Sequence, residues 1–181
     1  TLDGADHLLS NREDSLYAGN MIGQWAARYL DLKEKEPLVT DHQAVARIGQ
    51  EGFTTEIRAG KHSFLADEPP SVGGDDLGPS PYDLLVSGLG ACTVMTMRMY
   101  ADRKKWKVEE IRVHLEHDHV YEEDLQAAGE APRKIDLIRQ VIEIEGDLDE
   151  KQISRLMEIA DRCPVHRTLH NELRVETTLR S

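Results

Sequence analysis

Two cysteines, Cys92 and Cys163, are the strongest candidates for chemistry in this sequence. Cys92 lies within the stretch GPSPYDLLVSGLGACTVM, and Cys163 opens the later stretch CPVHRTL. A deprotonated cysteine is a nucleophile, and a cysteine oxidised to sulfenic acid condenses with a nearby thiol to form a disulfide. The alternative is a pair of inert buried cysteines, since free cysteine is among the most buried residue types.

Histidines form a second group of interest, at His114, His117 and His119, with Asp118 between the last two. On a strand, His117 and His119 share one face, while His114 and Asp118 lie on the other. The four side chains therefore cannot converge from this strand alone. We interpret them as a solvated strand face and predict no metal ligands.

The elements that must position the first cysteine begin with alternating runs separated by glycines, which predict strands. Pro81 then suits the first turn of a helix. Residues 84–97 carry no charge, which predicts a helix buried in a core or interface and too short to cross a membrane. Gly88 and Gly90 on this helix predict close packing of another backbone. The three expected strands are residues 44–48, 54–58 and 62–66.

The second cysteine follows another set of predicted elements. Residues 108–121 and 134–145 alternate as two strands of a hairpin. Asp149 is a good cap for a helix that ends before Cys163. Leu173, Val175 and Thr177 predict a last strand.

Composition restricts the classes of function. The chain has 181 residues, enough for one main domain with an appended segment, and a formal net charge of −12, which argues against nucleic-acid binding. We find no signal peptide and no long apolar run, so we expect a soluble, cytoplasmic protein without a membrane partner. The charged stretch KEKEP predicts a linker between an N-terminal helical segment, residues 1–39, and a main domain, residues 40–181.

The two cysteine stretches, in this order and with strands and a helix between them, resemble the OsmC/Ohr family. The resemblance runs from about Thr40 to the C-terminus. It implies an α+β fold with antiparallel sheets wrapped around long central helices, in an intertwined homodimer with active sites at the subunit interface. It also implies a two-cysteine peroxidase for organic hydroperoxides or hydrogen peroxide, in which Cys92 attacks the peroxide and Cys163 resolves the sulfenic acid as a disulfide. No cofactor is expected, only an external dithiol or lipoyl-type reductant.

The family also has an arginine near the first strand turn and a glutamate just after the proline that opens the helix. This sequence departs from both, because Tyr82 follows Pro81 and the turn GQEG contains no arginine. Asp83 lies about 13 Å along the helix axis from Cys92 and on the opposite face, so we expect it to act at the helix N-terminus. The side chains left open for activating or orienting the thiols are Arg47, Arg58, Asp83, His166 and Arg167.

The N-terminal stretch LDGADHLLSNREDSLYAGNMIGQWAARYL resembles the end of an α/β-hydrolase domain, with His7 matching a catalytic histidine. No G-x-S-x-G motif occurs in the chain, so the resemblance implies a fragment of a hydrolase fusion without hydrolase activity. A simple helical extension is the alternative. Two further alternatives remain for the main domain: a redox-sensing or ligand-binding module, or a dimerisation module of the hydrolase.

Overall fold

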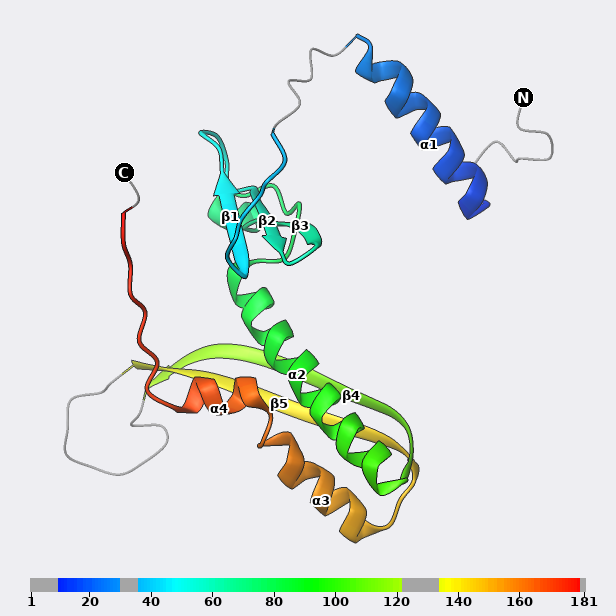
Figure 1. Ribbon diagram of the computed structural model, residues 1–181, viewed down its shortest axis with the longest axis vertical. Coiled ribbons are helices and arrows are strands. Elements are labelled where there is room, and N and C mark those ends of the chain that lie inside the picture. The colour runs from blue at the N-terminus through cyan, green and yellow to red at the C-terminus, as the bar shows by residue number, and fades with distance from the viewer. Residues whose placement is uncertain (1–9, 30–35, 122–133, 180–181) are drawn as a thin grey trace. The chain divides into compact units, whose positions relative to one another are not determined.

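The structure, a computed structural model, describes residues 10–29, 36–121 and 134–179. The chain divides into two compact units, Thr1–Val39 and Thr40–Ser181. The first unit contains helix α1 (Arg12–Ala27), shown in blue in Figure 1. The Asn11 side chain caps it by accepting a hydrogen bond from the Glu13 N–H at 2.8 Å. This helix lies within the predicted N-terminal helical segment, residues 1–39. His7 lies outside the described residues.

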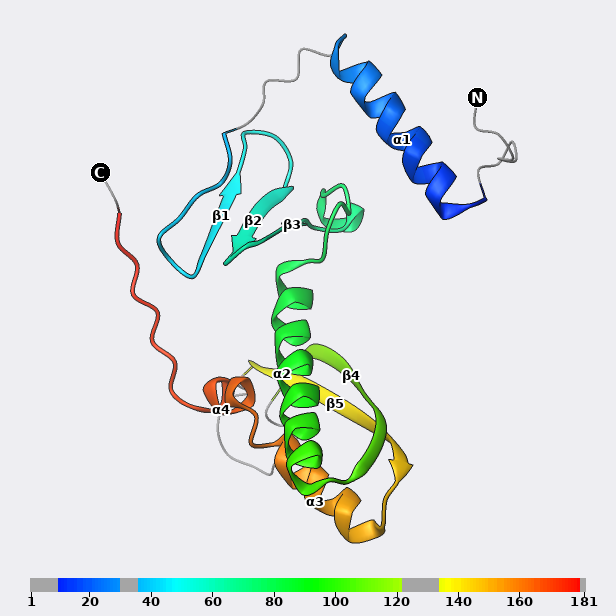
Figure 2. The same ribbon diagram turned by 45° about the vertical axis from the view of Figure 1, so that its right-hand side comes forward.

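The second unit opens with an antiparallel sheet in the order β1-β2-β3, which Figure 2 shows most clearly. Its strands are β1 (Ala44–Ile48), β2 (Thr55–Ala59) and β3 (His62–Ala66). Glycine at the turn between β2 and β3, Gly60, has φ +59°, a conformation that favours glycine. The three predicted strands are confirmed, with β2 displaced by one residue.

Asp67 holds the loop that follows β3. Its carboxylate is buried and accepts hydrogen bonds from Thr54 Oγ1 at 2.9 Å, from the Glu68 N–H at 2.8 Å and from the Leu77 N–H at 3.3 Å. Burial alone would raise the pKa of Asp67, but these hydrogen bonds together hold the pKa below its ordinary value of 3.8. The loop also contains the short 3-10 helix η1 (Pro70–Val72).

Helix α2 (Pro81–Lys104) is the long central element in Figure 1. Ser80 and Asp83 form a capping box at its start, with Pro81 in the first turn, as the sequence predicted. By length and composition α2 could cross a bilayer, which corrects the expectation of a shorter apolar segment; core helices of soluble proteins pass the same test. Its buried face carries Leu89, Gly90, Thr93, Met97 and Ala101.

A long hairpin lies against α2. Strands β4 (Lys107–Tyr121) and β5 (Lys134–Asp147) pair antiparallel, with Val113 opposite Ile142. A Cβ on Gly90 would come within 2.6 Å of Leu115 Cδ1 on β4, so α2 approaches the hairpin closely at this glycine. The close neighbour of Gly90 is a side chain rather than the predicted backbone, and a Cβ on Gly88 would have nothing within 4 Å.

Helix α3 (Glu150–Ala160) follows the hairpin and is capped by a capping box of Asp149 and Gln152. Together α2, β4 and α3 enclose an apolar core of Met97, Ala101, Val108, Leu156 and Ala160. At its edge Arg155 Nε donates a hydrogen bond to Tyr100 Oη at 3.1 Å. This bond lowers the pKa of Tyr100, against the opposite effect of burial, and raises the pKa of Arg155.

The end of the chain differs from prediction in two ways. A short helix, α4 (Pro164–His170), follows Cys163 and was not predicted. The segment of Leu173, Val175 and Thr177 was expected as a last strand, but residues 172–179 form no strand and are exposed. A strand needs hydrogen bonds from a neighbouring edge, and within the described chain none of the five strands supplies one to this segment. The predicted α+β class, with antiparallel sheets and a long central helix, is confirmed.

Candidate active site

Cys163 occupies the N-cap of α4. Its Sγ accepts a hydrogen bond from the His166 backbone N–H at 3.2 Å, and the residue is completely buried. Pro164 stands at the first helical position, where it has no N–H of its own to offer. The sulfur is therefore held in a fixed orientation at the start of the helix.

Thr93 connects Cys163 to the central helix. Its hydroxyl lies 3.7 Å from Cys163 Sγ and 3.3 Å from Gln140 Oε1 on β5, and the residue is completely buried. Since a hydroxyl has a single proton, Thr93 donates to one of these acceptors at a time. The Thr93 side chain on α2 therefore lies next to both Cys163 at the start of α4 and Gln140 on β5.

Cys92 immediately precedes Thr93 on α2 and is half-buried. Its carbonyl oxygen accepts a hydrogen bond from Thr96 Oγ1 at 2.7 Å within the helix. Both cysteines are free thiols. Cys163 thus contacts Thr93, the residue that follows Cys92. Of the two cysteines, Cys92 is the more accessible to solvent.

The predicted activating side chains have other partners. Asp83 accepts hydrogen bonds from Ser80 N at 3.0 Å and Ser80 Oγ at 2.7 Å, which is the expected role at the helix N-terminus. Arg47 pairs with Glu56 across β1 and β2 at 2.6 Å, and Arg58 Nε donates to the Gly60 carbonyl at 3.1 Å.

The remaining two predicted side chains lie on α4. Arg167 is exposed. His166 touches Cys163 through its backbone, while its ring stacks on His170 with centroids 4.5 Å apart. Its Nδ1 is buried and has no hydrogen-bond partner among the described residues. Both residues donate a backbone N–H to Cys163, His166 to Sγ and Arg167 to the carbonyl oxygen at 3.1 Å. None of the five predicted side chains has a described hydrogen bond from its side chain to a cysteine.

Thr93, Cys163 and Gln140 meet at one point, which we call the cysteine junction. A cavity of about 470 Å³ adjoins this junction. Gln140 and His166 line it, and each also contacts the junction, Gln140 through Thr93 and His166 through Cys163. Apolar side chains supply much of the remaining wall: Leu85, Leu89, Leu137, Ile138 and Leu169. Neither cysteine is among the described residues that line the cavity.

Three polar side chains meet beside the cavity, and two of them, His117 and Asp136, line its wall. His117 Nε2 and His119 Nδ1 each lie 2.9 Å from Asp136 Oδ1. His117 and His119 share a strand face, as predicted, but Asp136 on β5 was not anticipated. The Tyr82 ring from α2 stacks on His117 with centroids 4.3 Å apart.

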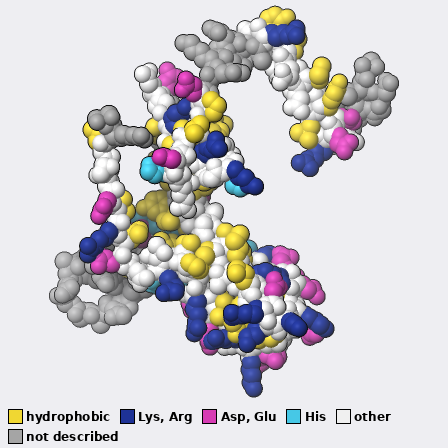
Figure 3. Space-filling model, in the orientation of Figure 1, with side chains coloured by type: hydrophobic (Ala, Val, Ile, Leu, Met, Phe, Trp, Pro, Cys, Tyr) yellow, Lys and Arg dark blue, Asp and Glu magenta, His cyan; other side chains and the backbone are white. Residues whose placement is uncertain are grey.

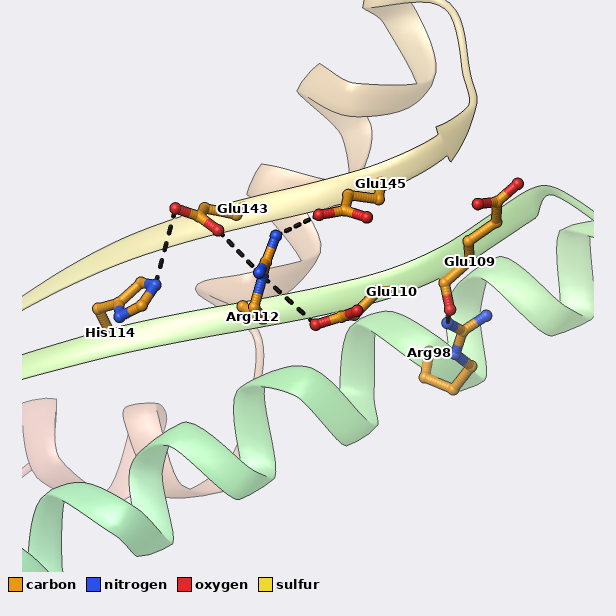
Figure 4. A network of polar contacts seen from close by, with 7 residues as sticks. All are labelled: Arg98, Glu109, Glu110, Arg112, His114, Glu143 and Glu145. Atoms are coloured by element: carbon orange, nitrogen blue, oxygen red, sulfur yellow. Dashed lines mark hydrogen bonds and ion pairs between the residues drawn. The ribbon is translucent and has the colours of Figure 1, made fainter.

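His114 belongs to a different group on the hairpin. It lies 3.7 Å from a carboxylate oxygen of Glu143, and Arg112 contacts Glu110, Glu143 and Glu145 (Figure 4). These side chains are about half exposed or more. They form a solvated network of charges, as the sequence suggested for this face.

The fold and the paired thiols define a class of small α+β protein with a cysteine on a central helix and a second cysteine at a later helix cap. The family described as OsmC-like protein matches residues 73–178, more than half of the chain. The chain therefore belongs to the OsmC-like family. No curated protein matches it.

Solved structures of the family share the fold. The OsmC-like protein from Mycoplasma pneumoniae is 18% identical, with a TM-score of 0.54 over 74% of this chain and 89% of that chain. An organic hydroperoxide resistance protein OsmC from Legionella pneumophila is 22% identical, with a TM-score of 0.51 over 74% and 91% of the two chains. An organic hydroperoxide resistance protein from Elizabethkingia anophelis is 20% identical, with a TM-score of 0.51 over 74% and 89%.

Proposed function

We propose that the protein reduces organic hydroperoxides, or hydrogen peroxide, by a cycle of Cys92 and Cys163. The observation that carries the proposal is the contact between Thr93 Oγ1 and Cys163 Sγ, because Thr93 is the residue next to Cys92. A disulfide requires two cysteines with Cα atoms about 4.4–6.8 Å apart, and a contact between Cys163 and the residue next to Cys92 supports such proximity. The names of the Legionella and Elizabethkingia proteins agree with this function.

The chemistry needs two thiols of different accessibility. The Cys92 thiolate attacks one peroxide oxygen, the O–O bond breaks, and an alcohol leaves after taking up a proton, so Cys92 becomes a sulfenic acid. The Cys163 thiol then attacks the Cys92 sulfur and releases water, which forms the disulfide. An external dithiol, of the lipoyl or protein type, reduces this disulfide and is itself oxidised. No resident cofactor takes part.

The surroundings suit the two roles. Cys92 is half-buried, so a peroxide can reach it, whereas Cys163 is enclosed and protected from direct oxidation. Five of the eleven described residues that line the adjoining cavity are leucine or isoleucine, and this apolar surface favours an organic hydroperoxide over hydrogen peroxide. We therefore expect cumene hydroperoxide to be the better substrate.

Peroxide consumption by the purified protein with an excess of dithiol tests the proposal. Cys92→Ser should reduce turnover to background, because no thiolate remains to attack the peroxide. Cys163→Ser, pre-reduced and assayed after removal of the dithiol, should consume about one equivalent and stop, with Cys92 held as a sulfenic acid that dimedone traps. Met99→Leu, at an exposed position on the same helix, is the matched control and should turn over normally.

Two results would contradict the proposal. A wild-type protein that reduces neither peroxide while both thiols remain titratable would favour a redox-sensing or ligand-binding module. Full turnover by the Cys92→Ser variant would assign the chemistry to another group.

We also propose that the protein acts as a homodimer. One face of α2 is uncovered within the described chain: Met95 and Met99 are 63% and 73% exposed, and a Cβ on Gly88 would meet nothing within 4 Å. The space-filling view likewise shows hydrophobic side chains at the surface over α2 (Figure 3). Exposed apolar surface of this kind marks an interaction site, and a second copy of α2 is complementary in character.

The mass of the protein in solution tests the dimer. Light scattering should give twice the chain mass, and Met95→Glu together with Met99→Glu should give the monomer mass, because two charges on each copy would oppose burial of this face. A wild-type monomer at micromolar concentration would contradict the dimer.

A further inference from the structure

The cluster of His117, His119 and Asp136 has a geometry that the peroxidase proposal does not use. We propose that these three side chains bind one divalent transition-metal ion, with Zn²⁺ as the probe. The inference shares no residue with the cysteine pair, so it stands or fails independently of the proposed function.

The backbone pairing of β4 and β5 brings the three side chains together. His119 lies directly opposite Asp136 in the register, and His117 lies opposite Ile138, two positions along the same strand face. Nearest neighbours across an antiparallel pair and alternate residues on one strand are the positions whose side chains meet. The site is therefore built on two paired strands rather than on a loop.

The distances fit a metal after a small adjustment. The candidate ligand atoms, one from each side chain, all lie within 4.8 Å of one another, and Asp136 Oδ1 is 2.9 Å from each histidine nitrogen. Zinc binds nitrogen and carboxylate oxygen at about 2.0–2.2 Å, so two ligands of a tetrahedral ion are about 3.4 Å apart. Opening each nitrogen–oxygen pair by about half an ångström would admit the ion between them.

The ligand types decide which ion is favoured. Two imidazoles and one carboxylate suit zinc and the neighbouring first-row transition metals, whereas magnesium and calcium prefer sites made of oxygen. The carboxylate also supplies a negative charge to offset part of the charge of the ion. Zn²⁺ should therefore bind far more tightly than Mg²⁺.

The first histidine is already held in place. The His117 side chain is 12% exposed, and its ring lies nearly parallel to that of Tyr82, with an interplanar angle of 12°. His119 and Asp136 are 45% and 64% exposed, so an ion can reach the cluster from solvent. A ligand fixed by packing loses little freedom on binding, which favours affinity.

An ion bound by this cluster could take a further ligand from the cavity. Three protein ligands leave at least one coordination position for water or an anion, as in catalytic zinc sites. Both His117 and Asp136 line the 470 Å³ cavity. A bound ion would thus lie at the wall of the same cavity that adjoins the cysteine junction.

Titration of the EDTA-treated, dialysed chain with Zn²⁺ by calorimetry tests the proposal, with Co²⁺ absorption as a second measurement. We expect one ion per chain, and affinity at least about tenfold weaker for His119→Ala and for Asp136→Asn. Both residues are partly exposed, so these variants should fold, which circular dichroism checks. The control is His114→Gln on the opposite face of β4, which should bind like wild type.

Thiols also bind zinc, so the titration is repeated in a chain carrying Cys92→Ser and Cys163→Ser. Retention of the single site in that chain supports the proposal. Loss of the site there would assign it to the cysteines and overturn the proposal. Binding that is absent in wild type, or weakened equally by His114→Gln, would also overturn it and leave a hydrogen-bonded histidine–aspartate cluster.

Discussion

The three-stranded sheet and the helix–hairpin region of the second unit are stabilised by different interactions. In the sheet and its following loop, strand residues are mostly exposed or half-buried, and the buried residues at the end of β3 are Ala66 and the charged Asp67. In the helix–hairpin region, five apolar residues of α2, β4 and α3 form a continuous buried core. Polar contacts therefore organise the first region and apolar burial the second, which determines how each responds to substitution and to pH.

The largest expected effect follows from removing core volume in the helix–hairpin region. Leu156 is completely buried on α3, so Leu156→Ala should lower the free energy of unfolding by about 2–5 kcal/mol in urea denaturation. Met157→Ala, at the next and 43% exposed position, is the control. Equal losses in the two variants would mean that apolar burial does not dominate this region.

A smaller effect with a distinctive pH dependence is expected from Asp67→Asn. Because the folded-state pKa of Asp67 is lowered, its carboxylate stabilises the fold fully above the ordinary pKa and loses this contribution as pH falls through the folded-state pKa. The variant should be less stable than wild type at pH 7, and the difference should shrink below about pH 4. Asp41→Asn, at an exposed position, is the control for the chemical change itself. A constant difference between Asp67→Asn and wild type across pH would contradict the account.

The helix that carries Cys92 offers a third comparison, within one element. Ser80→Ala removes the cap of α2 and should cost about 1 kcal/mol of unfolding free energy. The same substitution at Ser87, an exposed interior position, should be neutral or slightly stabilising, because alanine is the better helix former. A Ser80→Ala variant as stable as Ser87→Ala would mean that the capping box contributes nothing.

The smallest effect is expected from the exposed charges of the hairpin. Arg112 contacts three glutamates, yet its side chain is 48% exposed, so Arg112→Gln should cost less than about 1 kcal/mol. The loss should decrease further in about 1 M salt, because salt screens exposed charges. A loss that is unchanged by salt would indicate packing of the side chain rather than ion pairing.

The sequence predicted the elements with strong periodicity. The three short strands, the central helix, the hairpin and α3 all had clear patterns or caps, and Asp83 acts at the helix N-terminus, as the helical spacing from Cys92 indicated. Helix α4 was missed because its seven residues are too few for a periodic signal. A cysteine cap followed by Pro164 was the available sign.

Contacts between elements were harder to predict. Thr93 could not be linked to Cys163, nor Asp136 to the histidines, because register and helix packing depend on distant parts of the chain. The last strand expected from Leu173, Val175 and Thr177 had a suitable pattern, but the described residues contain no neighbouring strand edge that bonds to it. The pattern of residues in a segment indicates whether it favours a helix or a strand. Which other segments it contacts depends on the tertiary structure.

Cys163 Sγ is the N-cap acceptor of α4 and also the proposed resolving thiol. Cys163 Sγ accepts the hydrogen bond from the His166 N–H in the first turn of α4, and Pro164 has no N–H that would need an acceptor there. Any reaction that draws this sulfur away also removes the acceptor from the first turn. We therefore expect oxidation of Cys163 to weaken the first turn of α4, and the amide signal of His166 would report that change.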